Sequence, residues 1–265
     1  MFALSGLLSR KSLAALTSNN VAVGWTYLNG FVTEAVRGIR SSLVDRRKAT
    51  LVTAESTREF FEARSSLGFV NGGSDVIAVS STPYLSLLGA PSIRNILRTI
   101  PTDGVVIDYG CGSGNLLRYL HANGYSVQYV GYDLDRIAID HAKAKSANES
   151  AQFRHVDEII CPYDLAILVN VLVYNQEAPA INLLRMIRAG ARESAQILII
   201  EPYPKWYWEF AFDGIRLCPR DPSELEVLLE ATGWLPDELT GVSLFLMGGR
   251  SIFPIAYALS GRTKR

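Results

Sequence analysis

The sequence predicts an α/β protein with a mostly parallel sheet. From about residue 100 onward, apolar strand-like runs alternate with helical ones, and the run at 105–107 leads through an acid into three alternating glycines. Such alternation is typical of parallel strands joined by helical crossovers. With 265 residues, 48% of them hydrophobic, the chain can bury a full core. We expect a catalytic domain over 101–265, preceded by a mainly helical region over 1–100.

The glycine loop follows the first strand of this domain. Asp108 ends the strand, and Gly110, Gly112 and Gly114 follow at alternate positions. Glycine is needed where a backbone turns tightly and lets a ligand approach, so the loop predicts a nucleoside-cofactor site. A dinucleotide-binding loop would have its third glycine where Asn115 stands, and no P-loop lysine follows. The spacing therefore disfavours both dinucleotide and triphosphate binding.

A second acid ends the second strand. A helix over 115–123 closes at Gly124, and the strand at 127–132 runs into Asp133. A carboxylate at this position can accept hydrogen bonds from both hydroxyls of a ribose. Asp133 could instead cap the next helix, a role that Asp135 would serve equally well.

Together, Asp108-x-Gly-x-Gly-x-Gly114 and the later Gly-Tyr-Asp133 resemble the first motif and the following acidic motif of the class I S-adenosylmethionine-dependent methyltransferases. The resemblance implies a Rossmann-like seven-stranded sheet with an antiparallel last strand, an N-terminal helical lid and S-adenosylmethionine as cofactor. It continues to the C-terminus through expected helices at 136–147, 181–189 and 222–232 and expected strands at 152–158, 196–202, 242–246 and 253–259. The segment 163–174 resembles the fourth strand of the family and the loop that follows it.

The resemblance also suggests roles for individual residues. Asp157 and Glu158 would read the adenine edge, and Tyr174 would make a catalytic polar contact at the reacting end. The candidate cofactor-binding residues are Asp108, Gly110, Cys111, Gly112, Gly114, Asp133, Leu134, Asp157, Glu158 and Asn170. The candidate walls of the substrate pocket are Tyr203, Trp206 and Tyr207, although core packing explains some aromatic residues of this segment.

Composition limits the partners. Lys plus Arg equals Asp plus Glu at 26 each, so a broad basic face for nucleic acid is not expected. Three cysteines without paired spacing suit a reducing compartment, and we expect a cytoplasmic protein. No Cys or His cluster has metal-ligand spacing, and no apolar run is long enough to span a bilayer. Within 1–20, a helix packing on its own protein is favoured over a targeting peptide.

The acceptor is harder to predict than the cofactor. His121, His141 and His155 fall on two helices and a strand away from the expected substrate side, so a histidine base for a phenol or alcohol loses support. The sequence from Asn170 onward lacks the Asn/Asp-Pro-Pro-aromatic motif of enzymes that methylate nucleobase or glutamine amines. This departure also disfavours nucleic-acid and translation-factor substrates.

The main hypothesis is a methyltransferase, monomeric or homodimeric, that acts on a small, partly apolar metabolite in specialised biosynthesis. Two alternatives stay open. One is an enzyme of the same fold that transfers the aminocarboxypropyl group or cyclises the cofactor, as azetidine-forming synthases do, and releases methylthioadenosine. The other is a catalytically inactive cofactor-binding partner in a larger complex.

Overall fold

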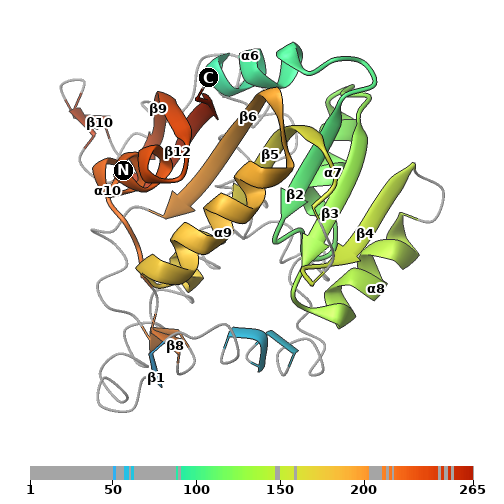
Figure 1. Ribbon diagram of the computed structural model, residues 1–265, viewed down its shortest axis with the longest axis horizontal. Helices are drawn as coiled ribbons and strands as arrows, with labels where there is room; N and C mark the ends of the chain where they lie inside the picture. Colours follow the sequence, from blue (N-terminus) through green and yellow to red (C-terminus); the bar gives the residue numbers. More distant parts are fainter. Residues whose placement is uncertain are drawn as a thin grey trace, which may run out of the picture.

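The computed structural model describes residues 50–51, 57–59, 61–62, 88, 91–146, 150–157, 160–202, 211–212, 215–216, 218–243, 246–247, 250–251 and 254–264. Their main feature is a seven-stranded sheet with the strand order β4-β3-β2-β5-β6-β12-β9 (Figure 1). In that order the strands are Ala151–His155, Gln128–Asp133, Val105–Tyr109, Tyr163–Val169, Ala191–Pro202, Pro254–Thr263 and Trp234–Ser243.

Strand direction follows the prediction. The pairs β2 with β3, β3 with β4, β2 with β5 and β5 with β6 are parallel, whereas β12 runs antiparallel to both β6 and β9. The expected Rossmann-like sheet with an antiparallel last strand is confirmed. The carboxyl ends of β2 to β6 consequently share one edge, where ligands bind in open α/β sheets.

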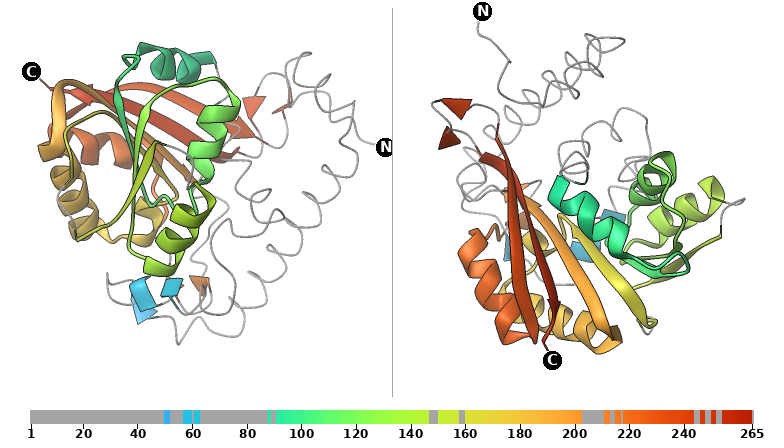
Figure 2. Two further views of the ribbon diagram at one scale, coloured as in Figure 1. Left: turned by 90° about the vertical axis from the view of Figure 1, so that its right-hand side faces the viewer. Right: turned by 90° about the horizontal axis from the view of Figure 1, so that it is seen from above.

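Helices cover both faces of the sheet, as Figure 2 shows from above. One face carries α6 (Pro91–Thr99), α7 (Asn115–Ala122) and α8 (Arg136–Lys145), and the other carries α9 (Glu177–Gly190) and α10 (Pro222–Ala231). Successive residues of β6 alternate between the two hydrophobic clusters, with Ile197 in one and Leu198 in the other. Burial on both faces explains why these strands read as continuous apolar runs.

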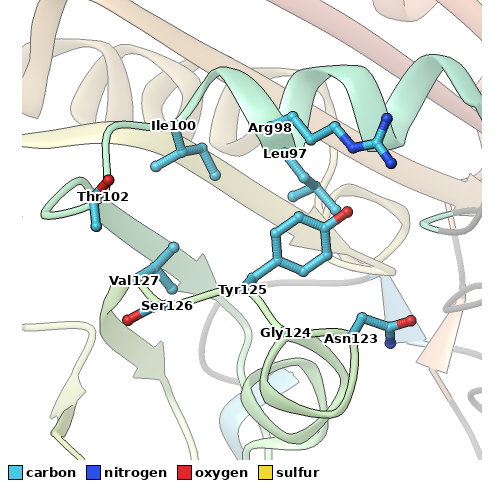
Figure 3. A pocket seen from close by; sticks show the side chains of 9 residues that line it. All are labelled: Leu97, Arg98, Ile100, Thr102, Asn123, Gly124, Tyr125, Ser126 and Val127. Carbon is cyan, nitrogen blue, oxygen red and sulfur yellow. The ribbon is translucent and has the colours of Figure 1, made fainter.

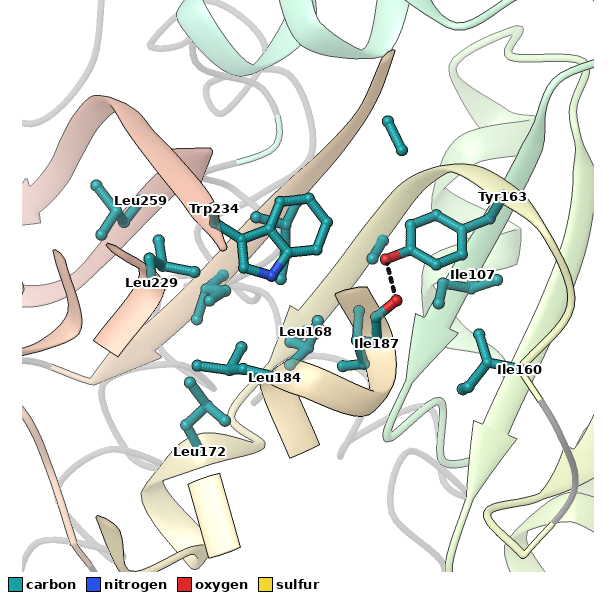
Figure 4. Close-up of a cluster of buried hydrophobic side chains, with 14 of the residues drawn as sticks. Ile107, Ile160, Tyr163, Leu168, Leu172, Leu184, Ile187, Leu229, Trp234 and Leu259 are labelled. Atoms are coloured by element: carbon teal, nitrogen blue, oxygen red, sulfur yellow. Dashed lines mark hydrogen bonds between the residues drawn. The ribbon is translucent and has the colours of Figure 1, made fainter. Parts of the chain in front are cut away.

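The larger cluster is centred on aromatic residues that tie α9 to the sheet (Figure 4). Tyr163 and Trp234 are fully buried, and the Tyr163 hydroxyl donates a hydrogen bond to the carbonyl oxygen of Ile187 at 2.7 Å. The guanidinium of Arg188 lies 5.6 Å from the centroid of the Trp234 ring. Tyr163 and Trp234 are the first residues of β5 and β9, so these contacts hold the amino ends of both strands in place.

Several element boundaries differ from the expected ones: β6 begins at Ala191 rather than at 196, and β12 ends at Thr263 rather than at 259. The strand expected at 242–246 is β9, which begins at Trp234, and α9 begins at Glu177 rather than at 181. The start of β9 could not be predicted because it contains three residue types that are rare in strands, at Pro236, Asp237 and Glu238. Because β9 is an edge strand, a proline is tolerated there.

Parts of the N-terminal region lie beyond the carboxyl edge of the sheet. β1 (Thr50–Leu51) pairs in parallel with β8 (Ile215–Arg216), which pairs antiparallel with β7 (Ala211–Phe212). In Figure 1, β1 and β8 lie at the bottom, on the side toward which β6 points. Residues 57–59 and 61–62 are helical, but most of 1–100 lies outside the described residues. A further hairpin joins β10 (Leu246–Met247) to β11 (Arg250–Ser251).

Candidate active site

The glycine loop turns directly from β2 into α7. Gly110, Gly112 and Gly114 all have left-handed backbones, with φ of 84°, 51° and 80°. The backbone N–H of Gly110 donates to the carbonyl oxygen of Tyr132 at 2.7 Å, which ties the loop to β3. A Cβ on Gly110 would lie 2.6 Å from the Cγ2 of Val171, so this position has no room for a side chain. The predicted need for glycine is therefore both conformational and steric.

Asp133 bridges the glycine loop and the turn that follows β3. Its Oδ2 accepts from the backbone N–H of Gly112 at 2.7 Å, and its Oδ1 accepts from that of Asp135 at 2.9 Å. Asp135, rather than Asp133, caps α8 by accepting from Ile137 and Ala138. Burial raises the pKa of Asp133 to about 6, although the N–H groups of Asp135 and Gly112 stabilise the carboxylate. The capping alternative for Asp133 is thus excluded.

Asp108 is buried beside the same loop. Its Oδ2 accepts a hydrogen bond from the hydroxyl of Tyr129, which lies on β3. Burial raises the pKa of Asp108 to about 7, the Tyr129 hydroxyl lowers it, and the charge of Asp133 raises it. Near neutral pH this carboxyl is poised between its two protonation states, so a cationic ligand beside it would favour ionisation.

Cys111, one of the candidate cofactor-binding residues, lies between the first two glycines and fills space against β3. Its side chain is 6% exposed, and a Cβ on Gly131 of β3 would lie 2.8 Å from the Cys111 sulfur. Burial raises the pKa of the Cys111 thiol well above its ordinary value. A thiol kept neutral in this way is not a nucleophile.

Two polar atoms at this edge are buried without a hydrogen-bond partner: the Ser113 hydroxyl and the amide oxygen Oδ1 of Asn170. Ser113 is 2% exposed, and Asn170 has a φ of 55°, a conformation that non-glycine residues rarely adopt. Buried polar atoms without partners are rare because each loses its hydration. Their presence beside the glycine loop is expected of a site that a ligand completes.

A short loop over 170–175, which contains the 3₁₀ turn Leu172–Tyr174, faces the glycine loop. Its three successive N–H groups at Val171, Leu172 and Val173 donate to the carboxylate of Glu201, at 2.9, 2.8 and 3.0 Å. Glu201, on β6, is 3% exposed, and burial raises its pKa to about 7, opposed by these N–H groups and by the charge of Arg220.

The expected adenine end lies where β3 and β4 finish side by side. Nε2 of His155 lies 3.1 Å from the carbonyl oxygen of Leu134, and its Nδ1 lies 2.8 Å from Oδ2 of Asp157. The Asp157 side chain is 61% exposed, with a guanidinium nitrogen of Arg58 at 3.6 Å and one of Arg136 at 3.9 Å. The structure therefore brings Leu134 and Asp157 together at the edge that carries Asp133.

Tyr174 ends the 3₁₀ turn of this loop and contacts the N-terminal region. Its ring centroid is 5.1 Å from that of Phe61, with the rings at 75°. Arg58 and Phe61 thus reach Asp157 and Tyr174, respectively, from one short segment. The remaining candidates lie outside the described residues: Glu158, Tyr203, Trp206 and Tyr207.

Comparison with known families shows which family the chain belongs to. The sequence pattern of the family "Methyltransferase domain" matches residues 87–239. The chain belongs to this methyltransferase family. The class I family, the S-adenosylmethionine cofactor and the transferase activity expected from the glycine loop are thereby confirmed. No curated protein matches the sequence.

Several solved structures of similar fold are methyltransferases. Magnesium protoporphyrin IX methyltransferase from Synechocystis PCC 6803 with bound S-adenosylhomocysteine is 15% identical, with a TM-score of 0.57 over 80% of this chain and 100% of that one. Geranyl diphosphate C-methyltransferase from Streptomyces coelicolor A3(2) is 11% identical, with a TM-score of 0.55 over 72% and 78%. An S-adenosylmethionine-dependent methyltransferase from Methanosarcina mazei is 15% identical, with a TM-score of 0.53 over 66% and 98%.

The methyltransferase also has a cavity of about 430 Å³ at the opposite edge of the sheet. Leu97, Arg98 and Ile100 line it from the end of α6, and Tyr125 and Val127 line it from the loop before β3 (Figure 3). These residues precede β2 and β3, so the cavity lies at the amino ends of the strands. It is separate from the glycine loop and is not part of the candidate active site.

In the described part of the methyltransferase, no group of three or more His, Cys, Asp and Glu side chains is placed to hold a metal ion. None of the helices in that part is both long enough and apolar enough to cross a membrane.

Proposed function

We propose that this methyltransferase transfers the methyl group of S-adenosylmethionine to a small, partly apolar metabolite in specialised biosynthesis. One observation carries the cofactor assignment at this site: the N–H of Gly112 donates to Asp133 at 2.7 Å. In a dinucleotide site such loop amides face an anionic pyrophosphate. Here two buried carboxylates, Asp108 and Asp133, stand beside the loop, and they suit a ligand that carries positive charge.

The residues of the site fit the parts of this cofactor. Asp108 uses Oδ2 for Tyr129, which leaves Oδ1 for the amine of the methionine part. Asp133 would accept from the ribose hydroxyls, because each of its oxygens has spare acceptor capacity beyond its one backbone N–H. Ser113 and Asn170 would give their unpartnered oxygens to the ligand. When bound, S-adenosylmethionine supplies an electrophilic methyl group on a sulfonium.

The acceptor side supports a small and partly apolar substrate. The aromatic pair of Phe61 and Tyr174 offers an apolar wall with one hydroxyl, and the chain is neutral overall with 26 basic and 26 acidic residues. Two structural relatives act on a magnesium porphyrin and on geranyl diphosphate by their names. These substrates differ in chemistry, so they support the small-molecule class and not one compound.

The N-terminal region would act as a lid over this site. Arg58 lies against the exposed Asp157, and Phe61 lies against Tyr174, so one helical segment reaches from the adenine end to the acceptor end. Methyl transfer is an in-line displacement that depends on alignment and on exclusion of water. A segment that makes both contacts serves both requirements. The division at residue 100 and the cytoplasmic location remain predictions from the sequence.

The test begins with binding of S-adenosylmethionine, S-adenosylhomocysteine and NAD by calorimetry. The proposal expects the first two to bind and NAD not to bind; NAD binding alone would contradict it. The protein is then incubated with methyl-labelled S-adenosylmethionine and with separate small-molecule, protein and RNA fractions. Label in the small-molecule fraction and release of S-adenosylhomocysteine support methyl transfer to a metabolite.

Other products would select the alternatives. Methylthioadenosine released without any acceptor would indicate cyclisation of the cofactor, and methylthioadenosine released only with an acceptor would indicate aminocarboxypropyl transfer. Label in protein or RNA would contradict the substrate class. Binding of the cofactor without turnover in any fraction would favour the inactive partner.

A further inference from the structure

We propose that Glu201 is a positioning residue of this enzyme: together with Arg220 it holds the loop 170–175 in the shape that presents Asn170 to the cofactor and Tyr174 to the acceptor. The inference rests on the proposed function, because it concerns the same site. Glu201 itself is buried behind the loop, and both of its carboxylate oxygens accept from the loop's N–H groups. Its effect would be exerted through the backbone.

The N–H groups of the loop converge on Glu201. Val171 and Leu172 donate to Oε1 at 2.9 and 2.8 Å, and Val173 donates to Oε2 at 3.0 Å. Three successive amides can share one carboxylate only because the chain turns tightly over Leu172–Tyr174. Hydrogen bonds to an ionised acceptor are stronger than neutral ones, so the charge of Glu201 stabilises this turn in particular.

The carbonyl groups of the same loop are held from the other side. Arg220 donates to the carbonyl oxygens of Leu172 at 2.7 Å and Asn175 at 2.5 Å. The N–H of Cys218 donates to the carbonyl oxygen of Val173 at 2.7 Å. The hydroxyl of Tyr257, on β12, donates to the carbonyl oxygen of Arg220 at 3.0 Å. The Glu201 carboxylate therefore binds the N–H groups of the loop, and the Arg220 guanidinium binds its carbonyl oxygens.

The loop 170–175 is in direct contact with the glycine loop. Val171 leaves no space for a side chain on Gly110, since a Cβ there would lie 2.6 Å from its Cγ2. Asn170 is held at a φ of 55°, with its N–H bonded to Ile200 at 2.9 Å and its side-chain oxygen unpartnered. Any shift of Val171 would change both Asn170 and the space beside Gly110.

The protonation state of Glu201 distinguishes this role from simple packing. The charged and titratable groups that influence it are Arg220, which lowers its pKa, and Tyr257 on the neighbouring strand. Because burial raises the pKa of Glu201 to about 7, the wild-type protein loses the negative charge behind the loop as the pH falls through neutrality. A substitution that removes this charge should therefore matter at alkaline pH and little at acidic pH.

The experiment compares Glu201→Gln with the wild type and with Tyr163→Phe as a matched control. Tyr163 donates a buried hydrogen bond to Ile187 on the far side of the core, away from the loop. Binding of S-adenosylhomocysteine is measured by calorimetry between about pH 6 and about pH 8.5, and hydrogen exchange of the backbone amides is followed by mass spectrometry over 170–175. Should Glu201→Gln fail to fold, Arg220→Lys is assessed by the same two measurements.

In Glu201→Gln, the side-chain NH₂ group replaces the oxygen that accepts from the N–H of Val173. Two donors then face each other, and this hydrogen bond is lost. We expect Glu201→Gln to bind S-adenosylhomocysteine about tenfold more weakly than the wild type at about pH 8.5, and about equally well at about pH 6. Its backbone amides over 170–175 should exchange hydrogen faster than those of the wild type. Tyr163→Phe should lower the melting temperature and leave affinity and loop exchange unchanged. Wild-type affinity and loop exchange in Glu201→Gln, or a loss equal at every pH, would overturn the inference. A wild-type protein that binds no S-adenosylhomocysteine would overturn the proposed function instead.

Discussion

Asp108, Asp133 and Glu201 each lie at the carboxyl edge of the sheet, and each uses its carboxylate differently. Asp108 accepts from a tyrosine hydroxyl, Asp133 accepts from two separate turns, and Glu201 accepts from three amides of one loop. All three are buried with a raised pKa. At the scale of single residues, the site therefore combines buried negative charge with backbone donors.

Sequence reasoning found the first two acids and missed the third. Asp108 and Asp133 stand next to glycines or an expected ribose position, whereas Glu201 is followed by a proline and bonds to amides about 30 residues earlier in the chain. An acid that ends an apolar strand is the signal the three share, and it would have marked Glu201. Tyr129 could not be found in this way, because its bond to Asp108 depends on the register between β2 and β3.

The first prediction concerns Gly110 and uses Gly124 as its control. Both have left-handed backbones, with φ of 84° and 77°, but a Cβ meets Val171 only at Gly110 and finds no atom within 4 Å at Gly124. Each alanine substitution should cost about 1 kcal/mol of stability from backbone strain. Gly110→Ala should in addition weaken S-adenosylmethionine binding about tenfold or more by calorimetry, whereas Gly124→Ala should not. Equal affinities in the two variants would contradict the assigned contact.

The second prediction concerns the proton on Asp108. Burial raises the pKa of Asp108 to about 7, and a cationic ligand lowers it again, so binding should release a proton. The affinity for S-adenosylmethionine should then rise several-fold between about pH 6 and about pH 8. Calorimetry in two buffers of different ionisation enthalpy detects the released proton directly. Asp108→Asn should abolish this proton release, whereas Asp140→Asn, a substitution of an exposed residue on α8, should leave it unchanged.

At the scale of elements, the helices were predicted more accurately than the strands at the edge of the sheet. The starts of α7, α8 and α10 agree with the expected ones, since a glycine turn or an aspartate cap marks each. The start of β9 and the short β1, β7 and β8 were not predicted, and the pairing of β1 with β8 joins residues far apart in the chain. The contacts of Arg58 with Asp157 and of Phe61 with Tyr174 are long-range as well.

The third prediction separates the two contacts of this N-terminal segment. The ion pair of Arg58 with Asp157 is solvent-exposed, with side chains 45% and 61% accessible, and such pairs contribute little. The edge-to-face contact of Phe61 with Tyr174 should hold the segment more firmly. In stopped-flow experiments, Phe61→Ala should release S-adenosylhomocysteine about fivefold faster. Arg58→Ala should change the rate by less than about twofold; the reverse order would contradict the lid contact.

At the scale of the whole molecule, the fold could be predicted because local signals and family resemblance agree. What the chain alone did not reveal is which strands are neighbours at the C-terminal half, where β12 lies between β6 and β9. That placement depends on matching two long apolar faces in space. The candidate site was predicted as a set of strand ends with an N-terminal lid, but the contacts of Arg58 with Asp157 and of Phe61 with Tyr174 were not predicted.

The fourth prediction concerns stability and pH in the ligand-free protein. A carboxyl group whose pKa is raised in the folded state binds its proton more tightly than in the unfolded chain. Its contribution to stability is present at acidic pH and is lost as the pH rises through the folded value, about 7 for Asp108. In urea titrations between about pH 5 and about pH 6.5, Asp108→Asn should reduce the fall in stability by about 1.4 kcal/mol per pH unit. Asp140→Asn should follow the wild type, and an unchanged slope in Asp108→Asn would show that its pKa is ordinary.

The position of β12 has a consequence for the order of assembly on the ribosome. Among the residues that the structure describes, β9 pairs only with β12, and β12 pairs with β6 on its other side. While the chain emerges from its N-terminus, β2 to β6 can associate early, but the outer side of β6 stays uncovered until 254–263 have been made. Of the seven strands in this sheet, the one synthesised last therefore lies inside the sheet, and β6 keeps an unpaired edge in the nascent chain until that strand is made.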